Sequence, residues 1–308
     1  MQLQTLCTGL RFPEGPVWLP DGSVLTTEIV AGRIRHLQPD GSSRILAETG
    51  GGPNGAAIGP DDALYVCNSG GMAYTEVPSR GWILPGEQPE DYTGGIIQRV
   101  DLATGAVSNV YTHCGAHMLR GPNDIVFDAA GGFWFTDHGK ARHRDRDRGG
   151  VYYAAADGSF IREVVFPLDA PNGIALSPDG RWLYVVESFT ARIWGFEVVA
   201  PGELRLKPKA RVFGAELMAG LGGYHLLDSM AVDAQGNLCI ATLGDKCGIT
   251  VVAPDRSFVN HIYLPGPMPT NICFGGTDMA TAYATLSVQG DLVSWEWSAH
   301  ESPYWEAA

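Results

Sequence analysis

The sequence lacks any apolar stretch long enough to cross a membrane. A membrane-spanning helix needs about 20 consecutive apolar residues, and no such run occurs among the 308 residues. The first residues, MQLQTLCTGLRF, have neither a basic start nor a sustained apolar region, so they do not resemble a secretion signal. These absences predict a cytoplasmic protein without membrane contact.

Basic residues are also scarce. The chain has 21 Lys and Arg against 34 Asp and Glu, which gives a formal net charge of −13. The one local concentration of basic residues, 142-RHRDRDR-148, is diluted by aspartates. A nucleic-acid-binding protein would present an undiluted basic patch. The composition therefore predicts no nucleic-acid partner and leaves the oligomeric state open.

Several reactive motifs are missing. The six cysteines form no C-x-x-C pair, which disfavours zinc and redox chemistry, and several lie in apolar runs typical of buried free thiols. The sequence has no G-x-S-x-G, no H-E-x-x-H and no phosphate-binding P-loop. A serine esterase is accordingly disfavoured.

Glycine and proline, by contrast, are abundant, and they punctuate a repeat. The chain has 40 Gly and 20 Pro. One pattern recurs six times: a polar residue, an apolar run, a turn of the D-G type and a second apolar run. The copies are 14-EGPVWLPDGSVLTTE, 54-NGAAIGPDDALYVCN, 123-NDIVFDAAGGFWFTD, 172-NGIALSPDGRWLYVVE, 228-DSMAVDAQGNLCIAT and 271-NICFGGTDMATAYAT. Each copy predicts a hairpin of two short strands.

Further apolar segments after the hairpins predict two more strands in each unit. Examples lie at 33–46, 96–111, 150–164, 193–198 with 204–213, and 249–264. Units of four strands that repeat about every 50 residues are typical of β-propeller blades. We therefore predict an all-β fold over residues 1–308: a six-bladed β-propeller with four antiparallel strands per blade around a central channel. The long connection 69–95 interrupts one unit and is expected to be functional or mobile.

The first residue of each repeat is a carboxylate or a carboxamide. In a propeller the innermost strands line the channel, so these positions should form a ring there. Asn and Asp also begin turns readily, which offers a purely structural explanation for any one of them. Six together favour a ring of oxygen donors, which suits a hard divalent cation such as Ca²⁺, Mg²⁺ or Mn²⁺. The predicted ring is Glu14, Asn54, Asn123, Asn172, Asp228 and Asn271.

Four motifs, in order along the chain, resemble those of the gluconolactonase/regucalcin family of six-bladed propellers, which includes diisopropylfluorophosphatase-like hydrolases. The motifs are 13-PEGPVW, 121-GPNDIVFDAAGGFWFTD, 171-PNGIALSPDGRWLYVVES and 227-LDSMAVDAQGNLCIA. The resemblance implies hydrolysis of a small lactone, such as a sugar lactone in carbohydrate metabolism, assisted by one divalent metal ion. Ca²⁺ is the preferred assignment, with Zn²⁺, Mn²⁺, Mg²⁺ and Fe²⁺ as alternatives.

The resemblance also implies roles for individual residues. Glu14, Asn172 and Asp228 would hold the metal, and Asn123 would be either a fourth ligand or a substrate contact. Asp228 would also be the general base. Because binding to a cation lowers a carboxylate's pKa and weakens it as a base, Asp124 is an alternative.

Three more residues are expected to contact the substrate: Arg120, Asn54 and His138. Two positions depart from the family pattern. Ser229 stands where many relatives have Gly, and His138-Gly139 stands where gluconolactonases often show two prolines. The loops 69–95, 138–149 and 214–227 are expected to shape the substrate site. Two alternatives stay open: a metal-dependent phosphotriesterase or arylesterase of the same fold, and a non-catalytic calcium-binding propeller.

Overall fold

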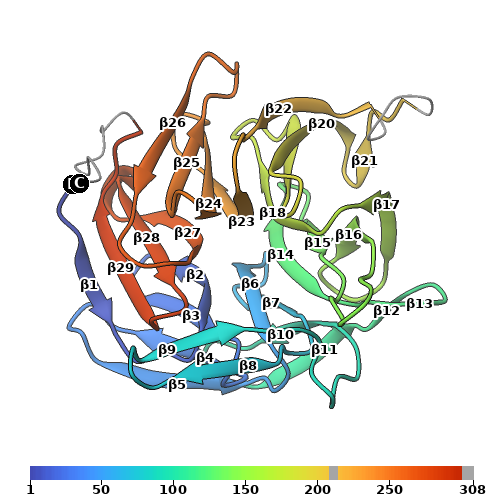
Figure 1. The fold of residues 1–308 in the computed structure, drawn as a ribbon. Helices are drawn as coiled ribbons and strands as arrows, with labels where there is room; N and C mark the ends of the chain where they lie inside the picture. The colour runs from blue at the N-terminus through green and yellow to red at the C-terminus, as the bar shows by residue number, and fades with distance from the viewer. Residues whose placement is uncertain (208–213, 300–308) are drawn as a thin grey trace.

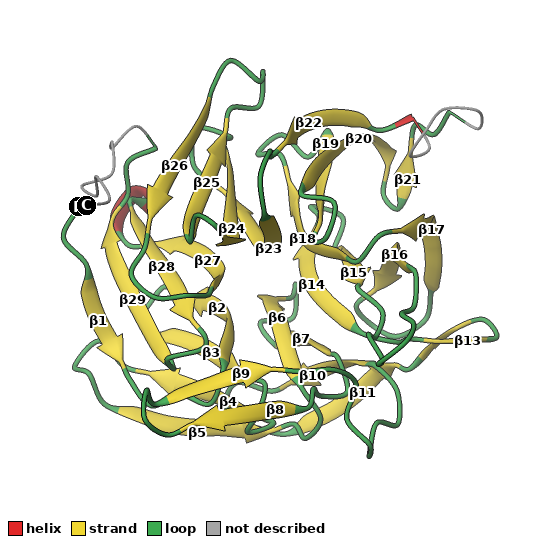
Figure 2. Ribbon diagram, viewed as in Figure 1, coloured by secondary structure: helices red, strands yellow, loops and turns green. Residues whose placement is uncertain are grey.

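The six sequence repeats fold into six hairpins, and each hairpin forms the two inner strands of a sheet. The structure is a computed structural model that describes residues 1–207 and 214–299. Figure 1 shows the six sheets standing as blades around a central opening. Figure 2 shows that the described chain is nearly all strand and loop. The predicted six-bladed propeller with four antiparallel strands per blade is confirmed.

The first three blades follow the chain from inside to outside. Blade 1 contains β2 (Pro13–Trp18), β3 (Val24–Glu28), β4 (Arg33–Leu37) and β5 (Ser43–Glu48). Blade 2 contains β6 (Pro53–Ile58), β7 (Leu64–Asn68), β10 (Ile96–Val100) and β11 (Val107–Tyr111). Blade 3 contains β14 (Pro122–Phe127), β15 (Gly132–Asp137), β16 (Gly149–Ala155) and β17 (Ile161–Leu168).

Blades 4 to 6 repeat this plan. Blade 4 contains β18 (Pro171–Leu176), β19 (Trp182–Glu187), β20 (Arg192–Ala200) and β22 (Glu216–Gly220), and the short β21 (Glu203–Leu204) also pairs with β20. Blade 5 contains β23 (His225–Val232), β24 (Leu238–Gly244), β25 (Gly248–Val252) and β26 (Val259–Tyr263). Blade 6 contains β27 (Pro269–Gly275), β28 (Thr281–Leu286), β29 (Asp291–Glu296) and β1 (Gln4–Cys7), with a 3-10 turn, η2 (Thr277–Met279), between β27 and β28.

The N-terminal strand closes the ring. β1 pairs antiparallel with β29, with Thr5 opposite Val293, so the first and last parts of the described chain share blade 6. This pairing joins residues that are almost 290 positions apart, and the repeat pattern did not predict it. Closure matters because it leaves the ring without a gap between its first and last blades.

Apolar side chains fill the space between neighbouring blades. One such core joins Trp134 and Val151 of blade 3 to Ile174 and Leu183 of blade 4. The Trp134 ring lies 4.8 Å from that of Tyr153, centroid to centroid. The alternating apolar residues of the repeats therefore pack one blade against the next.

Buried hydroxyls add a polar latch between blades. Thr27 of β3 donates a hydrogen bond of 2.9 Å to the Asn54 carbonyl of the next blade, and Thr136 of β15 donates one of 2.6 Å to the Asn172 carbonyl. Ser188 reaches the Leu227 carbonyl at 2.6 Å in the same way. These hydrogen bonds, which we call latches, satisfy backbone carbonyls of the innermost strands and join neighbouring blades.

The long connection 69–95 carries a hairpin of its own, β8 (Tyr74–Val77) and β9 (Trp82–Pro85). In Figure 1 this hairpin lies in front of blades 1 and 2, beside the central opening. Ile83 packs with Phe12, Ile29 and Val288, and its N–H donates to the Val288 carbonyl at 2.9 Å. The insertion therefore reaches from blade 2 to blade 6 and has regular structure, in place of the open loop that the sequence suggested.

Two sequence-based assignments around blade 4 are wrong. The outer strand was expected at 204–213, but it is β22 at Glu216–Gly220, inside the range 214–227 expected to be a loop. β22 buries Met218 against blade 5, which the segment 204–207, with its exposed Arg205 and Lys207, does not. The remainder of the expected strand, 208–213, lies outside the described residues.

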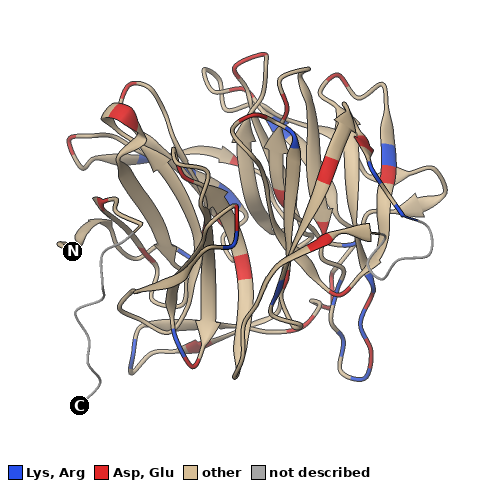
Figure 3. Ribbon diagram, turned by 90° about the horizontal axis from the view of Figure 1, so that it is seen from above, with Lys and Arg blue, Asp and Glu red and all other residues tan. Residues whose placement is uncertain are grey.

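Other features agree with the composition. Figure 3 shows acidic and basic residues interspersed over the loops and strands. All six cysteines are free; Cys67 and Cys239 are buried, whereas Cys273 is partly exposed. Within the described ranges, no helix has the length and apolar character needed to cross a bilayer.

We predict that Thr27→Val destabilises the propeller. The valine keeps the shape of the side chain but leaves the Asn54 carbonyl without its 2.9 Å hydrogen bond. Loss of a buried hydrogen bond of this kind costs about 1 to 3 kcal/mol in free energy of unfolding. Urea unfolding followed by circular dichroism measures the change. Thr27→Ser retains the hydroxyl as a control. Equal stability of the valine variant and wild type would contradict a stabilising role for this hydrogen bond.

Candidate active site

The six predicted ring residues all lie at the heads of the innermost strands. Each of these strands has a register shift against its neighbour at or just beside the ring position. A bulge of this kind bends the strand and re-aims a side chain. Five of the six residues are buried, with Glu14 only 2% exposed, and Asp228 is partly exposed.

The inner strands approach one another closely at these heads. A Cβ added to Gly15 would lie 2.4 Å from the Asn54 carbonyl oxygen, and one added to Gly55 would lie 2.6 Å from that of Asn123. Gly173 likewise lies against the backbone of Ser229 and Met230. At these three positions, lack of space therefore requires glycine after the ring residue.

Hydrogen bonds orient several of the ring side chains. Asn271 donates through Nδ2 to Glu14 Oε2 at 2.8 Å, which joins blades 6 and 1. Asn172 donates through Nδ2 to Ser188 Oγ at 3.1 Å, while its Oδ1 lies 3.5 Å from Ser229 Oγ. The amide nitrogens of Asn271 and Asn172 are thus engaged.

Two other amide oxygens have no such partner. Asn54 Oδ1 and Asn123 Oδ1 are buried, and within the described chain neither accepts a hydrogen bond. A buried acceptor without a donor is costly. These two oxygens therefore require a ligand, a water or an ion for satisfaction.

Three carboxyl groups share this small region. Burial, and secondarily the nearby Glu14, raises the pKa of Asp124 to about 7 and the pKa of Asp228 well above its usual value. Burial also raises the pKa of Glu14, although the hydrogen bond from Asn271 opposes the shift. No ion pair among the described residues involves these three acids.

Asp124 is held differently from Asp228. Its Oδ1 accepts the Ile125 N–H at 3.0 Å and its Oδ2 accepts the Ile174 N–H of the next blade at 3.4 Å. Both oxygens are thus engaged by backbone, and the side chain is only 7% exposed. Asp124 ties blade 3 to blade 4, whereas Asp228 is partly exposed.

The donor set suits a hard cation. Buried acids whose pKa values are raised by burial, and for Asp124 and Asp228 also by Glu14, together with the unpartnered Asn123 Oδ1, provide oxygen ligands and uncompensated negative charge. Among residues 1–207 and 214–299, no group of three His, Cys, Asp or Glu side chains is placed to hold a metal. The predicted set of Glu14, Asn123, Asn172 and Asp228 has only two such side chains, because amides supply the other oxygens.

The predicted substrate residues Arg120 and His138 lie just before the start of β14 and just after the end of β15. Arg120 is exposed, and its backbone N–H donates to Asp137 Oδ2 at 2.7 Å. His138 is partly buried, and its ring meets that of Phe189 edge-on at 6.0 Å. Burial lowers the pKa of His138 to about 4, so its imidazole is neutral at ordinary pH.

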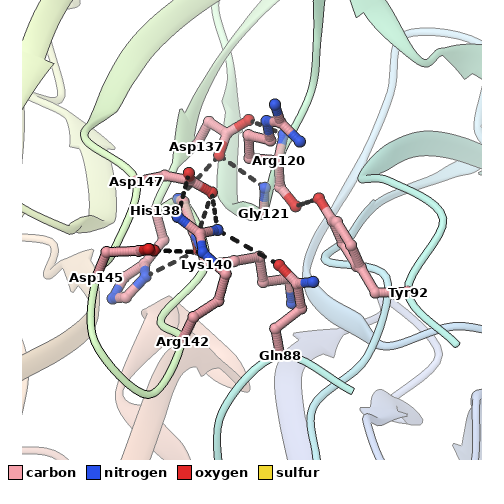
Figure 4. A network of polar contacts seen from close by, with 11 residues as sticks. Gln88, Tyr92, Arg120, Gly121, Asp137, His138, Lys140, Arg142, Asp145 and Asp147 are labelled. Carbon is pink, nitrogen blue, oxygen red and sulfur yellow. Dashed lines mark hydrogen bonds and ion pairs between the residues drawn. The ribbon is translucent and has the colours of Figure 1, made fainter. Parts of the chain in front are cut away.

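Figure 4 shows a polar network at this rim that the motifs did not predict. Asp137 accepts hydrogen bonds from the backbone of Arg120, Gly121 and Gly139 at 2.7 to 2.9 Å. Lys140 is buried and donates to the Gly71 carbonyl at 2.6 Å. The sequence did carry a signal for part of this network, because copies of the repeat end in an acid or amide: Glu28, Asn68, Asp137 and Glu187.

Comparison with known proteins places this site in context. The family model described as SMP-30/Gluconolactonase/LRE-like region matches residues 12–288. A gluconolactonase of Zymomonas mobilis subsp. mobilis is 29% identical over 298 residues, which covers 89% of this chain and 76% of that protein.

Solved structures show the same fold. The gluconolactonase XC5397 from Xanthomonas campestris has a TM-score of 0.73 at 23% identity, covering 95% of this chain and 88% of that one. A regucalcin from Agrobacterium tumefaciens, described as a calcium-binding protein, has a TM-score of 0.69 at 19% identity, covering 94% and 92%.

We predict that the chelated protein loses stability as the pH rises through the titration of Asp124. Its pKa is about 7 in the folded chain and about 3.9 in an unfolded one. The unfolded chain therefore releases this proton first, and stability falls as the pH rises between these values. In Asp124→Asn, the fall in melting temperature from pH 5 to about pH 8 should be smaller than in wild type.

The control for this measurement is Asp61→Asn, in the β6–β7 turn at the opposite end of blade 2, where Asp61 pairs with Arg99 at 2.7 Å. It should retain the wild-type pH dependence. Identical pH profiles for Asp124→Asn and wild type would contradict the assignment of a raised pKa to Asp124.

Proposed function

Because the chain belongs to the SMP-30/gluconolactonase/LRE-like family, we propose that it is a metal-dependent lactonase acting on a sugar lactone or a similar small lactone. The observation that carries the proposal is the buried ring of acid and amide oxygens at the heads of the innermost strands. The similar gluconolactonases support the reaction class. The absence of serine-hydrolase and zinc-protease motifs agrees with it.

Glu14, Asn172 and Asp228 would hold a divalent ion, with Asn123 as the fourth ligand. The calcium-binding regucalcin of the same fold supports Ca²⁺ as the first choice, and Zn²⁺, Mn²⁺, Mg²⁺ and Fe²⁺ are alternatives for oxygen ligands. When bound, such an ion supplies a Lewis acid for the lactone carbonyl and lowers the pKa of a water molecule. The unpartnered Asn123 Oδ1 favours its role as a ligand.

Asp228 is the better candidate for general base. It is partly exposed, so it would be able to reach a water molecule, whereas both oxygens of Asp124 are engaged by backbone N–H groups. Asp228 would accept the proton of the attacking water, and Asp124 would keep blades 3 and 4 in place. Asn54 Oδ1 would accept a hydrogen bond from a substrate hydroxyl.

Arg120 and His138 would complete the substrate site at the rim. The exposed Arg120 guanidinium can donate to hydroxyl or carboxylate oxygens. Because its pKa is about 4, His138 would act as a neutral hydrogen-bonding group and not as a cation.

We predict that a chelator abolishes lactone hydrolysis and that added divalent ions restore it. A pH-indicator assay of lactone hydrolysis measures this loss and recovery.

We also predict that Asp228→Asn lowers kcat by about 100- to 10,000-fold, the usual contribution of a general base. Asp61→Asn, at the distal turn, should retain the activity. A pH-indicator assay with D-glucono-1,5-lactone measures these rates. Full activity of Asp228→Asn would overturn the assignment of the site.

Substrate comparison tests the alternatives. A lactonase should hydrolyse aldonolactones or aliphatic lactones faster than phenyl acetate or a paraoxon-like phosphotriester. Faster turnover of those esters would support an arylesterase or phosphotriesterase. Calcium binding by calorimetry with no turnover of any ester would instead identify a non-catalytic calcium-binding propeller.

A further inference from the structure

Lys140 is a buried cation with hydrogen-bonding capacity to spare. Its side chain is 8% exposed, its Nζ donates to the Gly71 carbonyl at 2.6 Å, and it lies 5.3 Å from the centre of the Tyr92 ring. An ammonium has three donors. Within the described chain, Nζ makes no other hydrogen bond and no ion pair. Two donors therefore remain for a ligand.

The neighbouring acids are already engaged. Asp137 accepts three backbone N–H groups, and Asp147 pairs with Arg142 at 2.9 Å, as Figure 4 shows. Burial lowers the pKa of Lys140 to about 8, and the negative charges of Asp137 and Asp147 oppose only part of this shift. A buried ammonium without an ion-pair partner is unfavourable, and an anion bound beside it would remove this cost.

Lys140 lies in the loop that follows β15 of blade 3, and its hydrogen bond reaches Gly71 in the loop that follows β7 of blade 2. Its hydrogen-bond partner Gly71 packs on Gly52, where an added Cβ would lie 2.6 Å from the Gly71 Cα. Gly52 is two residues before Asn54. The amide oxygens of Asn54 and of Asn123 in blade 3 are buried and unpartnered. Lys140 is thus held at the end of the propeller where β6 and β14, which carry these two residues, begin.

Gly139 directs the chain to this position. It packs on Gly121, two residues before Asn123, where an added Cβ would lie 2.7 Å from the Gly139 carbonyl oxygen. Its φ is +77°, which proline, with φ near −65°, cannot adopt. The departure at His138-Gly139 therefore has a structural consequence, because this backbone turn sends Lys140 across to blade 2.

We propose that Lys140 is a specificity-determining residue that binds a negatively charged group, carboxylate or phosphate, on the substrate. The substrate class is then an anionic sugar lactone and not a neutral one. A hydroxyl of this substrate would lie against the Asn54 oxygen, and Arg120 at the same rim adds a second cation. This inference rests on the proposed lactonase function.

Stable ring analogues test the charge preference without hydrolysis. D-glucuronate carries a carboxylate at C6, and D-glucose 6-phosphate carries a phosphate on its C6 oxygen. D-glucose has an unmodified hydroxyl group at the same position. By calorimetry with Ca²⁺ present, at least one anion should bind about 10- to 100-fold more tightly than glucose, the range expected for hydrogen bonds to a charged group. The anion that binds more tightly distinguishes carboxylate from phosphate. No preference over glucose would overturn the proposal.

Substitution assigns the preference to Lys140. Lys140→Met should abolish the preference and leave glucose binding within about two-fold. Arg144→Met removes one charge from an exposed position of the same loop and should retain it. Lys140→Gln removes the charge but keeps a donor for the Gly71 carbonyl, so it tests the proposal if the methionine variant folds poorly. A preference that survives in Lys140→Gln would overturn the role of Lys140.

Turnover separates recognition from structure. For D-glucono-1,5-lactone and the corresponding lactone of D-glucaric acid, Lys140→Gln should lower kcat/KM for the anionic lactone alone. An equal loss for both would make Lys140 a structural anchor of the insertion and would overturn the proposal. If wild type hydrolyses no lactone, the lactonase function fails, whereas Lys140-dependent binding of glucuronate or the phosphate would still support the anion site.

Discussion

The structure depends on the close approach of six innermost strands at one end of the channel. The approach leaves no room for a Cβ at Gly15, Gly55 or Gly173, and a register shift bends each strand there. The same crowding places carboxylate and amide oxygens of different blades within reach of one another, as the Asn271–Glu14 hydrogen bond shows. A site lined by carboxylate and amide oxygens is therefore a direct result of how the blades meet.

This crowding has an electrostatic cost that the rest of the fold must offset. Burial raises the pKa values of Glu14, Asp124 and Asp228, and the nearby Glu14 adds to the shifts of the two aspartates. These shifts are destabilising when the groups ionise. The apolar cores between blades, the hydroxyl latches and the β1–β29 closure hold the ring together despite it. The contacts between blades and the β1–β29 pairing thus stabilise the fold, whereas the ring at the inner strands carries the destabilising buried acids.

The rim, formed by the insertion 69–95 and the loop after β15, provides side chains that differ from blade to blade. The ring residues are acids and amides at equivalent positions of a repeat, so they say little about which substrate is preferred. The insertion 69–95 and the loop after β15 differ from the other blades, and they bring Tyr92, Lys140 and Arg120 together. Many activities share one fold, and discrimination among substrates is expected to lie in such non-repeated segments.

The sequence alone determined the number of blades, the hairpins and the ring positions, because these depend on local alternation and turn residues that recur in every copy. It also carried the family motifs around Glu14, Asn172 and Asp228. Only the tertiary structure decided the outer strand of blade 4, the closure by β1, the engagement of Asp124 by backbone and the burial of Lys140. Each of these depends on contacts between segments distant in sequence, which no local pattern records.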